Sequence, residues 1–284
     1  MYIFFRDLDR RWIFLVMFLA VAIPILLELQ FPEAPSPIVQ NVFDAIENLP
    51  DGSVILLAFD YDPASKGELE PMAAAFTRHC AEKKHKLIFM TLWPQGVPML
   101  QNAIDIVNQE YPQYTYGTDY VNLGFRPGSE GVIKVVVGDM KELFTGDQHG
   151  TSLTDLPLTQ NLKNIREVDL LANVSAGSPG TKEWVQYAAT PYQIPIVTGT
   201  TGVTAPGLYP YIPDQMIGML GAIKGAAEYE KIILQEYPRL AENPKAEEGL
   251  RRMGPQLTAH VLMVVLIVIG NIVYFVGRRR GDVR

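Results

Sequence analysis

The sequence predicts a doubly wound α/β domain with a mainly parallel sheet, flanked by one N-terminal and one C-terminal transmembrane helix. Three observations lead to this prediction. Short apolar runs alternate with helical patterns through the middle of the chain. A long uncharged stretch lies near each end, and arginines bound both stretches.

The composition excludes several classes of protein. The chain has 284 residues, of which 48% are hydrophobic and 19% are charged, so it is neither disordered nor collagen-like. The formal charge is -7, and no basic run with interleaved aromatics lies away from the termini, so we expect no nucleic-acid partner. Cys80 is the only cysteine, which rules out an internal disulfide and a cysteine zinc site.

The first uncharged stretch runs from Trp12 to Leu27, and extension to Leu29 adds only Glu28. Because a bilayer core requires about 20 apolar residues, we predict a transmembrane helix over residues 12–29. A cleavable signal peptide has a similar basic and apolar pattern. The sequence that follows offers no small-x-small cleavage pattern, which favours the transmembrane helix.

The second uncharged stretch, Leu257 to Gly277, is the strongest membrane signal in the chain, and we predict a transmembrane helix over it. His260 and Asn271 are its only strongly polar side chains. The amide of Asn271, beside Gly270, either bonds a partner helix or faces the first helix of the same chain. The sequence leaves both interpretations open.

The arginines predict the orientation of the two spans. The N-terminal tail carries three arginines and the C-terminal tail carries four, whereas residues 30–50 carry none. Because basic residues are retained on the cytoplasmic side, we expect a two-pass protein of the cytoplasmic (inner) membrane with both termini cytoplasmic and the main domain extracytoplasmic. Basic residues just before the second span favour the opposite orientation; these are Arg239, Lys245, Arg251 and Arg252.

The predicted organisation has seven parts. They are a cytoplasmic tail (1–11), a transmembrane helix (12–29), a Pro-rich tether (30–37), an extracytoplasmic α/β domain (38–240), a linker (241–256), a second transmembrane helix (257–277) and a cytoplasmic tail (278–284).

Within the α/β domain, apolar runs without alternation predict buried strands. The expected strands are residues 53–59, 86–93, 132–137, 169–175 and 194–199, and the expected helices are 68–83, 97–109, 181–189 and 215–236. Such strands, separated by helices, indicate a parallel sheet of Rossmann-like type that is covered on both faces.

Ligands of such sheets bind outside the carboxyl ends of the strands. Two loops of small residues, 175–181 and 198–202, follow predicted strands, and the first opens a predicted helix. Backbone N–H groups at a helix start suit an anion, although the same residues also serve as helix caps and turns. The candidate ligand-binding residues are Ser175, Gly177, Ser178, Gly180, Thr181, Thr200 and Thr201. One possible function is therefore a small-ligand receptor for an anion or polyol.

The first predicted strand ends in Asp60-Tyr61-Asp62. This string resembles the first motif of haloacid-dehalogenase-like phosphatases. The resemblance implies Asp60 as nucleophile, Asp62 as acid/base and Thr91 as phosphate ligand, with Asp60 and Asp139 holding Mg²⁺. A second possible function is therefore a Mg-dependent phosphohydrolase. In the competing interpretation, Asp60 and Asp62 cap the following turn.

Two further features are candidates for an interface. Small residues recur at helical spacing in the last predicted helix of the domain, where they favour either packing on the sheet or a subunit contact. Two tyrosines in the preceding Pro-rich loop suit a surface contact or a cover for the sheet edge. The interface candidates are Tyr209, Tyr211, Gly218, Gly221, Ala222, Gly225 and Asn271.

The layout as a whole resembles the gliding-motility-type auxiliary proteins of ABC transporters. The resemblance rests on the first span, an amphipathic segment at Val42 to Leu49, the strings DGSVILLAFDYDP and KLIFMTLWP, and the closing span. It covers residues 38–138 in pattern and implies a non-catalytic α/β module that binds a partner or a ligand outside the membrane. We therefore expect an accessory or scaffold subunit of a larger membrane assembly without a cofactor. Its expected partners are the lipid bilayer and other subunits of the complex or a second copy.

Overall fold

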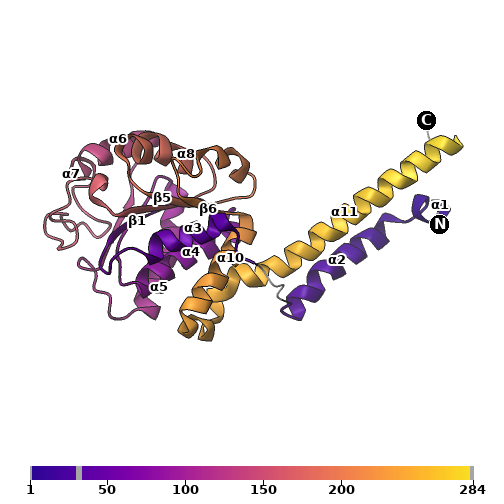
Figure 1. The fold of residues 1–284 in the computed structure, drawn as a ribbon, viewed down its shortest axis with the longest axis horizontal. Coiled ribbons are helices and arrows are strands. Elements are labelled where there is room, and N and C mark those ends of the chain that lie inside the picture. The colour runs from indigo at the N-terminus through magenta and orange to yellow at the C-terminus, as the bar shows by residue number, and fades with distance from the viewer. Residues whose placement is uncertain (1, 30–33, 282–284) are drawn as a thin grey trace. The chain divides into compact units, whose positions relative to one another are not determined.

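The computed structural model describes residues 2–29 and 34–281 of the chain (Figure 1). Residues 30–33 of the predicted tether and residues 282–284 of the predicted C-terminal tail lie outside the described residues. The chain divides into two units, Glu33–Gly249 and a second unit made of Met1–Pro32 with Leu250–Arg284.

The first unit is built on a six-stranded parallel sheet. Its strands are β1 (Val54–Asp60), β2 (Lys86–Thr91), β3 (Tyr120–Phe125), β4 (Leu170–Ser175), β5 (Ile196–Thr200) and β6 (Gly218–Gly221), in the order β3-β2-β1-β4-β5-β6. Leu57 of β1 pairs with Phe89 of β2 on one side and with Ala172 of β4 on the other. The strand order reverses between β1 and β4, which is the switch point of the sheet.

Helices cover both faces of this sheet, which is why the strands are mainly apolar. Figure 1 shows α3, α4 and α5 on one side of the sheet and α6 and α8 on the other. The first layer contains α3 (Pro37–Glu47), α4 (Lys66–Glu82), α5 (Val97–Glu110) and α10 (Ala222–Glu236). The second contains α6 (Glu130–Gly138), α7 (Met140–Leu143) and α8 (Thr181–Trp184), which continues as a π-helix (Val185–Ala189) into α9 (Thr190–Tyr192). The predicted α/β class and parallel sheet are confirmed.

Short 3₁₀ turns connect several of these elements. They are Pro94–Gly96, Ile165–Glu167, Ala205–Gly207, Tyr209–Tyr211, Pro238–Glu242 and Pro244–Glu247.

The predicted strand at residues 132–137 is wrong, because this segment forms α6. Its buried residues Val132, Ile133, Val136 and Val137 lie on one helical face and join a core cluster with Trp184. The third strand is instead β3, whose apolar pattern is interrupted by Asn122 and Gly124. The β-branched residues of 132–137 predicted a strand by their propensity, but the positions that are buried follow the spacing of a helix.

The predicted helix at residues 215–236 is wrong in its first part, because residues 218–221 form β6 and α10 begins only at Ala222. Gly218 lies so close to the carbonyl of Ile38 in α3 that a side chain would collide with it. A side chain at Gly225 would likewise collide with the backbone of Leu220. These two glycines therefore allow close packing inside the unit.

The second unit contains α1 (Tyr2–Arg6), α2 (Arg10–Leu26) and α11, whose bounds are Glu248–Arg280. The hydroxyl of Thr258 donates to the carbonyl of Ala20 at 2.6 Å, which joins α11 to α2. The guanidinium of Arg280 lies 5.0 Å from the ring centre of Tyr2. Helix α11 therefore contacts α2 through Thr258 and α1 through Arg280. Residues 248–256, which we predicted as linker, are the first turns of α11.

In the described part of the chain, one helical stretch is long and apolar enough to cross a membrane. This stretch is Pro244–Arg280, with a mean hydropathy of 2.5 over its most apolar window. The assignment rests on length and composition. Helix α2 has 17 residues and contains Pro24, and the N-terminal transmembrane helix remains a prediction.

Candidate functional site

The carboxyl ends of β1 and β4 meet at the switch point, where Asp60 is fully buried. Its carboxylate accepts hydrogen bonds from the backbone N–H of Leu92 at 2.7 Å, from the amide of Asn173 at 2.8 Å and from the indole of Trp184 at 2.8 Å. These three donors come from the segment after β2, from β4 and from α8. Asp60 therefore ties together the elements that surround the switch point.

Burial raises the pKa of Asp60 from 3.8 to about 7, and the three N–H donors reduce the rise without cancelling it. The cause is the loss of water around the charged form, which is the dominant effect for a carboxyl in a protein interior.

A chain of hydroxyl groups continues the cluster from Asn173 toward β5. Thr181 donates its hydroxyl to the side-chain carbonyl of Asn173 at 2.6 Å and lies 2.6 Å from the hydroxyl of Thr198. The hydroxyl of Ser175 lies 2.8 Å from that of Thr181 and accepts from the N–H of Thr181 at 3.1 Å. All of these side chains are buried, so their hydrogen bonds are satisfied inside the protein.

Trp93 covers the switch point. Its indole N–H donates to the carbonyl of Pro179 at 2.7 Å, and a side chain at Gly177 would contact its ring. Trp93 follows β2, whereas Gly177 and Pro179 follow β4, so the indole reaches across β1. The crevice that binds ligands in many such sheets is therefore closed here by a side chain of this protein.

The β4–α8 loop is also fixed by Glu183. Its carboxylate accepts from the N–H of Gly180 and from the hydroxyl of Ser178, both at 2.8 Å. A side chain at Gly180 would collide with the carbonyl of Gly177 and with Ser175. The carboxylate of Glu183 already accepts the N–H of Gly180, so an anion at this helix start would lose that donor and be repelled by a negative charge.

Asp60 and Thr91 of the phosphohydrolase hypothesis end the adjacent strands β1 and β2, whereas Asp62, Thr91 and Asp139 each make hydrogen bonds within their own local segment. Asp62 accepts from the N–H of Ser65 at 3.0 Å, as a turn cap does. The hydroxyl of Thr91 is buried and bonds the backbone of Trp93. Asp139 caps α7 by accepting from the N–H of Lys141 at 2.9 Å. Within residues 2–29 and 34–281, no three His, Cys, Asp or Glu side chains form a group that could hold a metal ion.

The remaining ligand candidates are mostly turned inward. Thr200 is buried and donates to the carbonyl of Ser175 at 3.2 Å. Thr201 is half-buried and lies 3.0 Å from the hydroxyl of Thr204. Ser178 is exposed, and its hydroxyl is held by Glu183. The predicted residues do lie together at one edge of the sheet, but they bond mainly to one another.

The interface candidates separate into two groups. Tyr209 is exposed, whereas Tyr211 is half-buried against the core and its hydroxyl accepts from Gln186 at 3.2 Å. Gly221 and Ala222 are half-buried at the junction of β6 and α10. Tyr211 therefore covers the sheet, and Tyr209 is the tyrosine available to a partner.

Asn271 is exposed on α11, and its amide donates to the carbonyl of Ile267 in the same helix at 2.8 Å. Of the two interpretations that the sequence left open, the contact with the first helix of the chain is not formed.

Sequence reasoning missed the residues that build the cluster: Asn173, Thr198, Trp184, Trp93 and Glu183. A signal existed for Asn173 and Thr198, because each is a polar residue inside an otherwise apolar predicted strand. No sequence signal places Trp93 or Trp184 beside the cluster, because their contacts join segments that are far apart in the chain.

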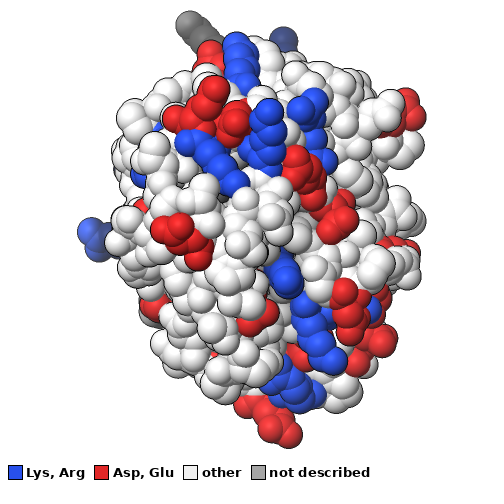
Figure 2. Space-filling view, turned by 90° about the vertical axis from the view of Figure 1, so that its left-hand side faces the viewer, with Lys and Arg blue, Asp and Glu red and all other residues white. Residues whose placement is uncertain are grey.

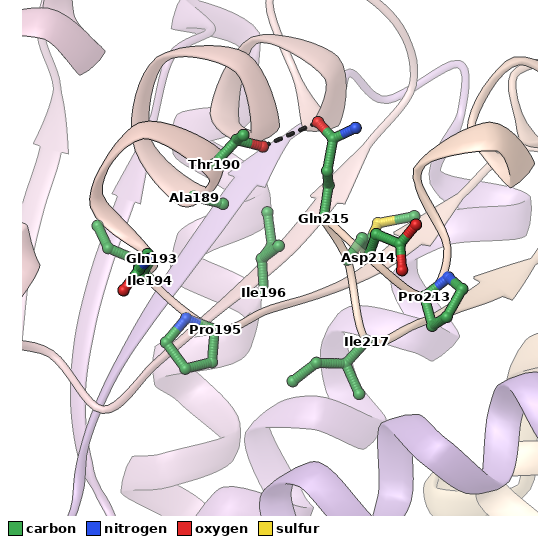
Figure 3. A pocket seen from close by; sticks show the side chains of 11 residues that line it. Ala189, Thr190, Gln193, Ile194, Pro195, Ile196, Pro213, Asp214, Gln215 and Ile217 are labelled. Carbon is green, nitrogen blue, oxygen red and sulfur yellow. Dashed lines mark hydrogen bonds between the residues drawn. The ribbon is translucent and has the colours of Figure 1, made fainter.

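A pocket of about 440 Å³ opens elsewhere, before the first residues of β5 and β6 (Figure 3). Thr190 donates to the side chain of Gln215 at 2.9 Å at its rim, and Asp214 is exposed there. Apolar residues such as Ile196 and Met216 line it as well. None of the predicted site residues contributes to this pocket.

Figure 2 shows how the charged side chains are distributed on one face of the protein. On the face shown in Figure 2, lysine and arginine side chains are interspersed with aspartate and glutamate. Such a mixed surface on this face does not form the basic stripe that nucleic-acid binding requires.

The fold and the closed switch point define an α/β protein with a Rossmann-like strand order. No family model matches the chain, and no curated protein matches it. Among solved structures, the crystal structure of AibC is similar, with a TM-score of 0.32 and 12% sequence identity. The match covers 80% of this chain and 50% of the AibC chain, so this chain spans about half the length of that protein. At this level of similarity, no function transfers from AibC.

Proposed function

We propose that this protein is a membrane-anchored, non-catalytic accessory or scaffold subunit whose α/β domain binds a partner within a larger membrane assembly. The observation that carries the proposal is the closed switch point. Asp60 is fully buried and accepts hydrogen bonds from three N–H groups of neighbouring elements. A nucleophile or a ligand cradle has to reach its substrate, and here Trp93 and the β4–α8 loop cover the approach.

The apolar character of α11 supports membrane anchoring. Its window of highest hydropathy has no buried residues, and large side chains such as Val264 and Ile267 are exposed. Exposure of so large an apolar protein surface to water is unfavourable, whereas the hydrocarbon of a membrane can cover it. We propose that α2 is a second span, since it pairs with α11 through Thr258 and Ala20.

The orientation follows from the arginines. In a two-pass arrangement, Arg10 and Arg11 at the start of α2 lie on the same side as Arg278 at the end of α11. We propose that this side is the cytoplasm and that the α/β unit is extracytoplasmic. The resemblance of residues 38–138 to gliding-motility-type auxiliary proteins supports the same placement.

The loop between β5 and β6 is the proposed partner surface. Val203 is 93% exposed and Tyr209 is 51% exposed, while Leu208 between them is buried and anchors the loop. Rigid aromatic and apolar groups on an anchored loop bury area against a partner at small entropic cost.

Native gel electrophoresis after mild detergent extraction tests the proposed assembly. We expect the native protein to migrate in a complex well above the mass of a single detergent-bound chain. The paired Val203→Asp and Tyr209→Ala substitutions should release the chain from that complex. Tyr192→Ala is the matched control, because Tyr192 is also an exposed tyrosine but lies on α9. Migration of the native protein as a lone chain would contradict the proposal.

Cysteine labelling tests the orientation. Lys182 is exposed on α8, and the native Cys80 is buried, so a Lys182→Cys variant carries one accessible thiol. We expect a membrane-impermeant maleimide to label this variant in intact cells or spheroplasts. Labelling that appears only after lysis would place the α/β unit in the cytoplasm and contradict the proposed orientation.

A further inference from the structure

Helix α11 has one apolar face toward α2, and the rest of its circumference is exposed and largely apolar. The side chains of the face toward α2 are half-buried: Thr258, Leu262, Leu266, Ile269, Val273 and Val276. The pairing is fixed by the hydrogen bond from Thr258 to Ala20. This face therefore has its partner within the chain.

One stripe of this exposed side carries His260, Val264, Ile267, Asn271 and Tyr274, and all five side chains are exposed. Their spacing of four, three, four and three residues is the seven-residue repeat of a helix–helix seam. Val264 follows Leu262 by two residues, which is about 200° around an α-helix, so this stripe points away from the face toward α2. We refer to these five residues as the free face of α11.

The free face contains both strongly polar side chains of the apolar segment. Asn271 uses one amide hydrogen on the carbonyl of Ile267, and the side-chain oxygen of Asn271 accepts no hydrogen bond from the described residues. His260 has one ring nitrogen 2.9 Å from the carbonyl of Gln256, and its other ring nitrogen is exposed. Asn271 lies four residues from Ile267, the midpoint of residues 257–277, so it is about 6 Å from the centre of the apolar segment along the helix.

Lipid is a poor environment for these groups. Water cannot solvate an amide at that depth, and leaving its oxygen and second hydrogen unpaired is costly. A partner that lies on the free face must therefore supply both a hydrogen-bond donor and an acceptor at the level of Asn271. Lipid tails supply neither.

We infer that the free face of α11 binds the same face of α11 in a second copy of this chain. The inference rests on the proposed membrane anchoring. Two copies inserted in one membrane have the same orientation, so a two-fold axis along the membrane normal places Asn271 opposite Asn271. An amide is both donor and acceptor and can therefore pair with its own copy. The heptad spacing suits the left-handed crossing that such helix pairs adopt.

Cysteine cross-linking in native membranes tests this inference. Val264→Cys and Ile267→Cys place a thiol on the free face, and Val265→Cys and Val268→Cys place one on neighbouring exposed positions off that face. Under mild oxidation, we expect disulfide-linked dimers of the full-length chain from the first pair and far less from the second. The native Cys80 is buried, so it adds no background.

The role of Asn271 is tested separately with the Val264→Cys reporter. Asn271→Leu should lower the yield of dimer by about threefold to tenfold, the size of one interhelical hydrogen bond in a membrane. Asn271→Gln keeps a donor and an acceptor and should retain most of the dimer. If Asn271 had only a structural role within its own chain, the glutamine and leucine variants should give the same yield of dimer, because the side chain of residue 271 is exposed.

Alkaline carbonate extraction of the same membranes separates the two proposals. If the chain is extracted, the membrane anchoring of the proposed function fails. If the chain stays in the membrane and the free-face thiols cross-link no better than the off-face thiols, the pairing of α11 with itself is overturned and the anchoring stands. Cross-linking of the free face to a different protein would equally overturn pairing with a second copy.

Discussion

The indole N–H of Trp93 donates to the backbone carbonyl of Pro179 at 2.7 Å, across the strand that separates their elements. Trp93 follows β2 and Pro179 follows β4, and β1 lies between those strands. The hydrogen bond therefore closes the point of the sheet where parallel α/β proteins commonly bind ligands.

Replacement of Trp93 should loosen the β4–α8 loop. In Trp93→Phe a smaller aromatic ring remains but the N–H donor is lost, so we expect a stability loss of at least about 1 kcal/mol. Amide hydrogen exchange of Gly180 and Thr181 should become faster, because their N–H groups lie in that loop. Tyr209→Phe changes an exposed ring on another loop and should leave this exchange unchanged. Unaltered exchange in Trp93→Phe would show that the loop does not depend on the indole.

Asp60 should make stability depend on pH. Its pKa is raised to about 7 in the folded protein by burial, above the ordinary value near 3.8. Between about pH 4 and pH 7 the folded state holds a proton that the unfolded state has lost, so this contribution to stability is complete below pH 4 and is lost as pH rises through 7. Three pKa units correspond to about 4 kcal/mol.

Chemical denaturation of wild type and Asp60→Asn across this pH range measures that contribution. The free energy of unfolding of wild type minus that of Asp60→Asn should be highest near pH 4 and should fall as pH rises to 7. A constant difference would mean that Asp60 titrates outside this range. Asp62→Asn is the control, because Asp62 is half-buried and accepts only from the N–H of Ser65 among the described contacts.

Glu47 should produce the opposite dependence. The hydrogen bond from His79, at 2.9 Å, lowers the pKa of Glu47 to about 2, and the hydroxyl of Tyr237 at 2.7 Å contributes. A carboxylate only accepts, so His79 donates from Nε2 and accepts the hydroxyl of Tyr229 at Nδ1. Stability from Glu47 is therefore present above about pH 4.5 and is lost as pH falls toward 2.

Glu47→Gln should therefore cost about 1–2 kcal/mol at neutral pH and progressively less in acid. Burial lowers the pKa of His79, so wild type also loses stability as pH falls below about 6.5. Denaturation curves of both proteins at pH 7 and pH 3 separate these effects. An equal cost at both values would contradict the assignment to Glu47.

Gly218→Ala and Gly131→Ala should have effects of opposite sign. A methyl group at Gly218 collides with the carbonyl of Ile38 and crowds Val42, so we expect α3 to separate from β6 at a cost of about 2–3 kcal/mol. Gly131 lies in α6 with open space around it, so alanine there should stabilise by about 1 kcal/mol through helix propensity. Thermal unfolding of the two variants measures both, and a neutral Gly218→Ala would show that α3 can shift.

The sequence by itself determined the class of the fold and most of its elements. Apolar runs at residues 53–59, 86–93, 169–175 and 194–199 become β1, β2, β4 and β5 because a strand buried on both faces is mostly apolar along its length. The apolar stretch 257–277 lies within α11, and its length and composition are those that the sequence alone displays.

The tertiary structure alone decided residues whose conformation depends on distant partners. Residues 132–137 have strand propensity, yet they form a helix because one face of that helix fills the core beside Trp184. Gly218 and Gly221 fit a helical pattern, yet they lie in β6, where Gly218 allows α3 to approach.

The same physical reason applies to the candidate site. The sequence places Asp60 and Ser175 at strand ends, but their donors and acceptors, such as Trp184 and Thr181, arrive from other elements. Whether a strand end is an open site or a closed one depends on which side chains fold over it. Trp93 closes this one through a contact between segments 86 residues apart in the chain, which no local pattern encodes.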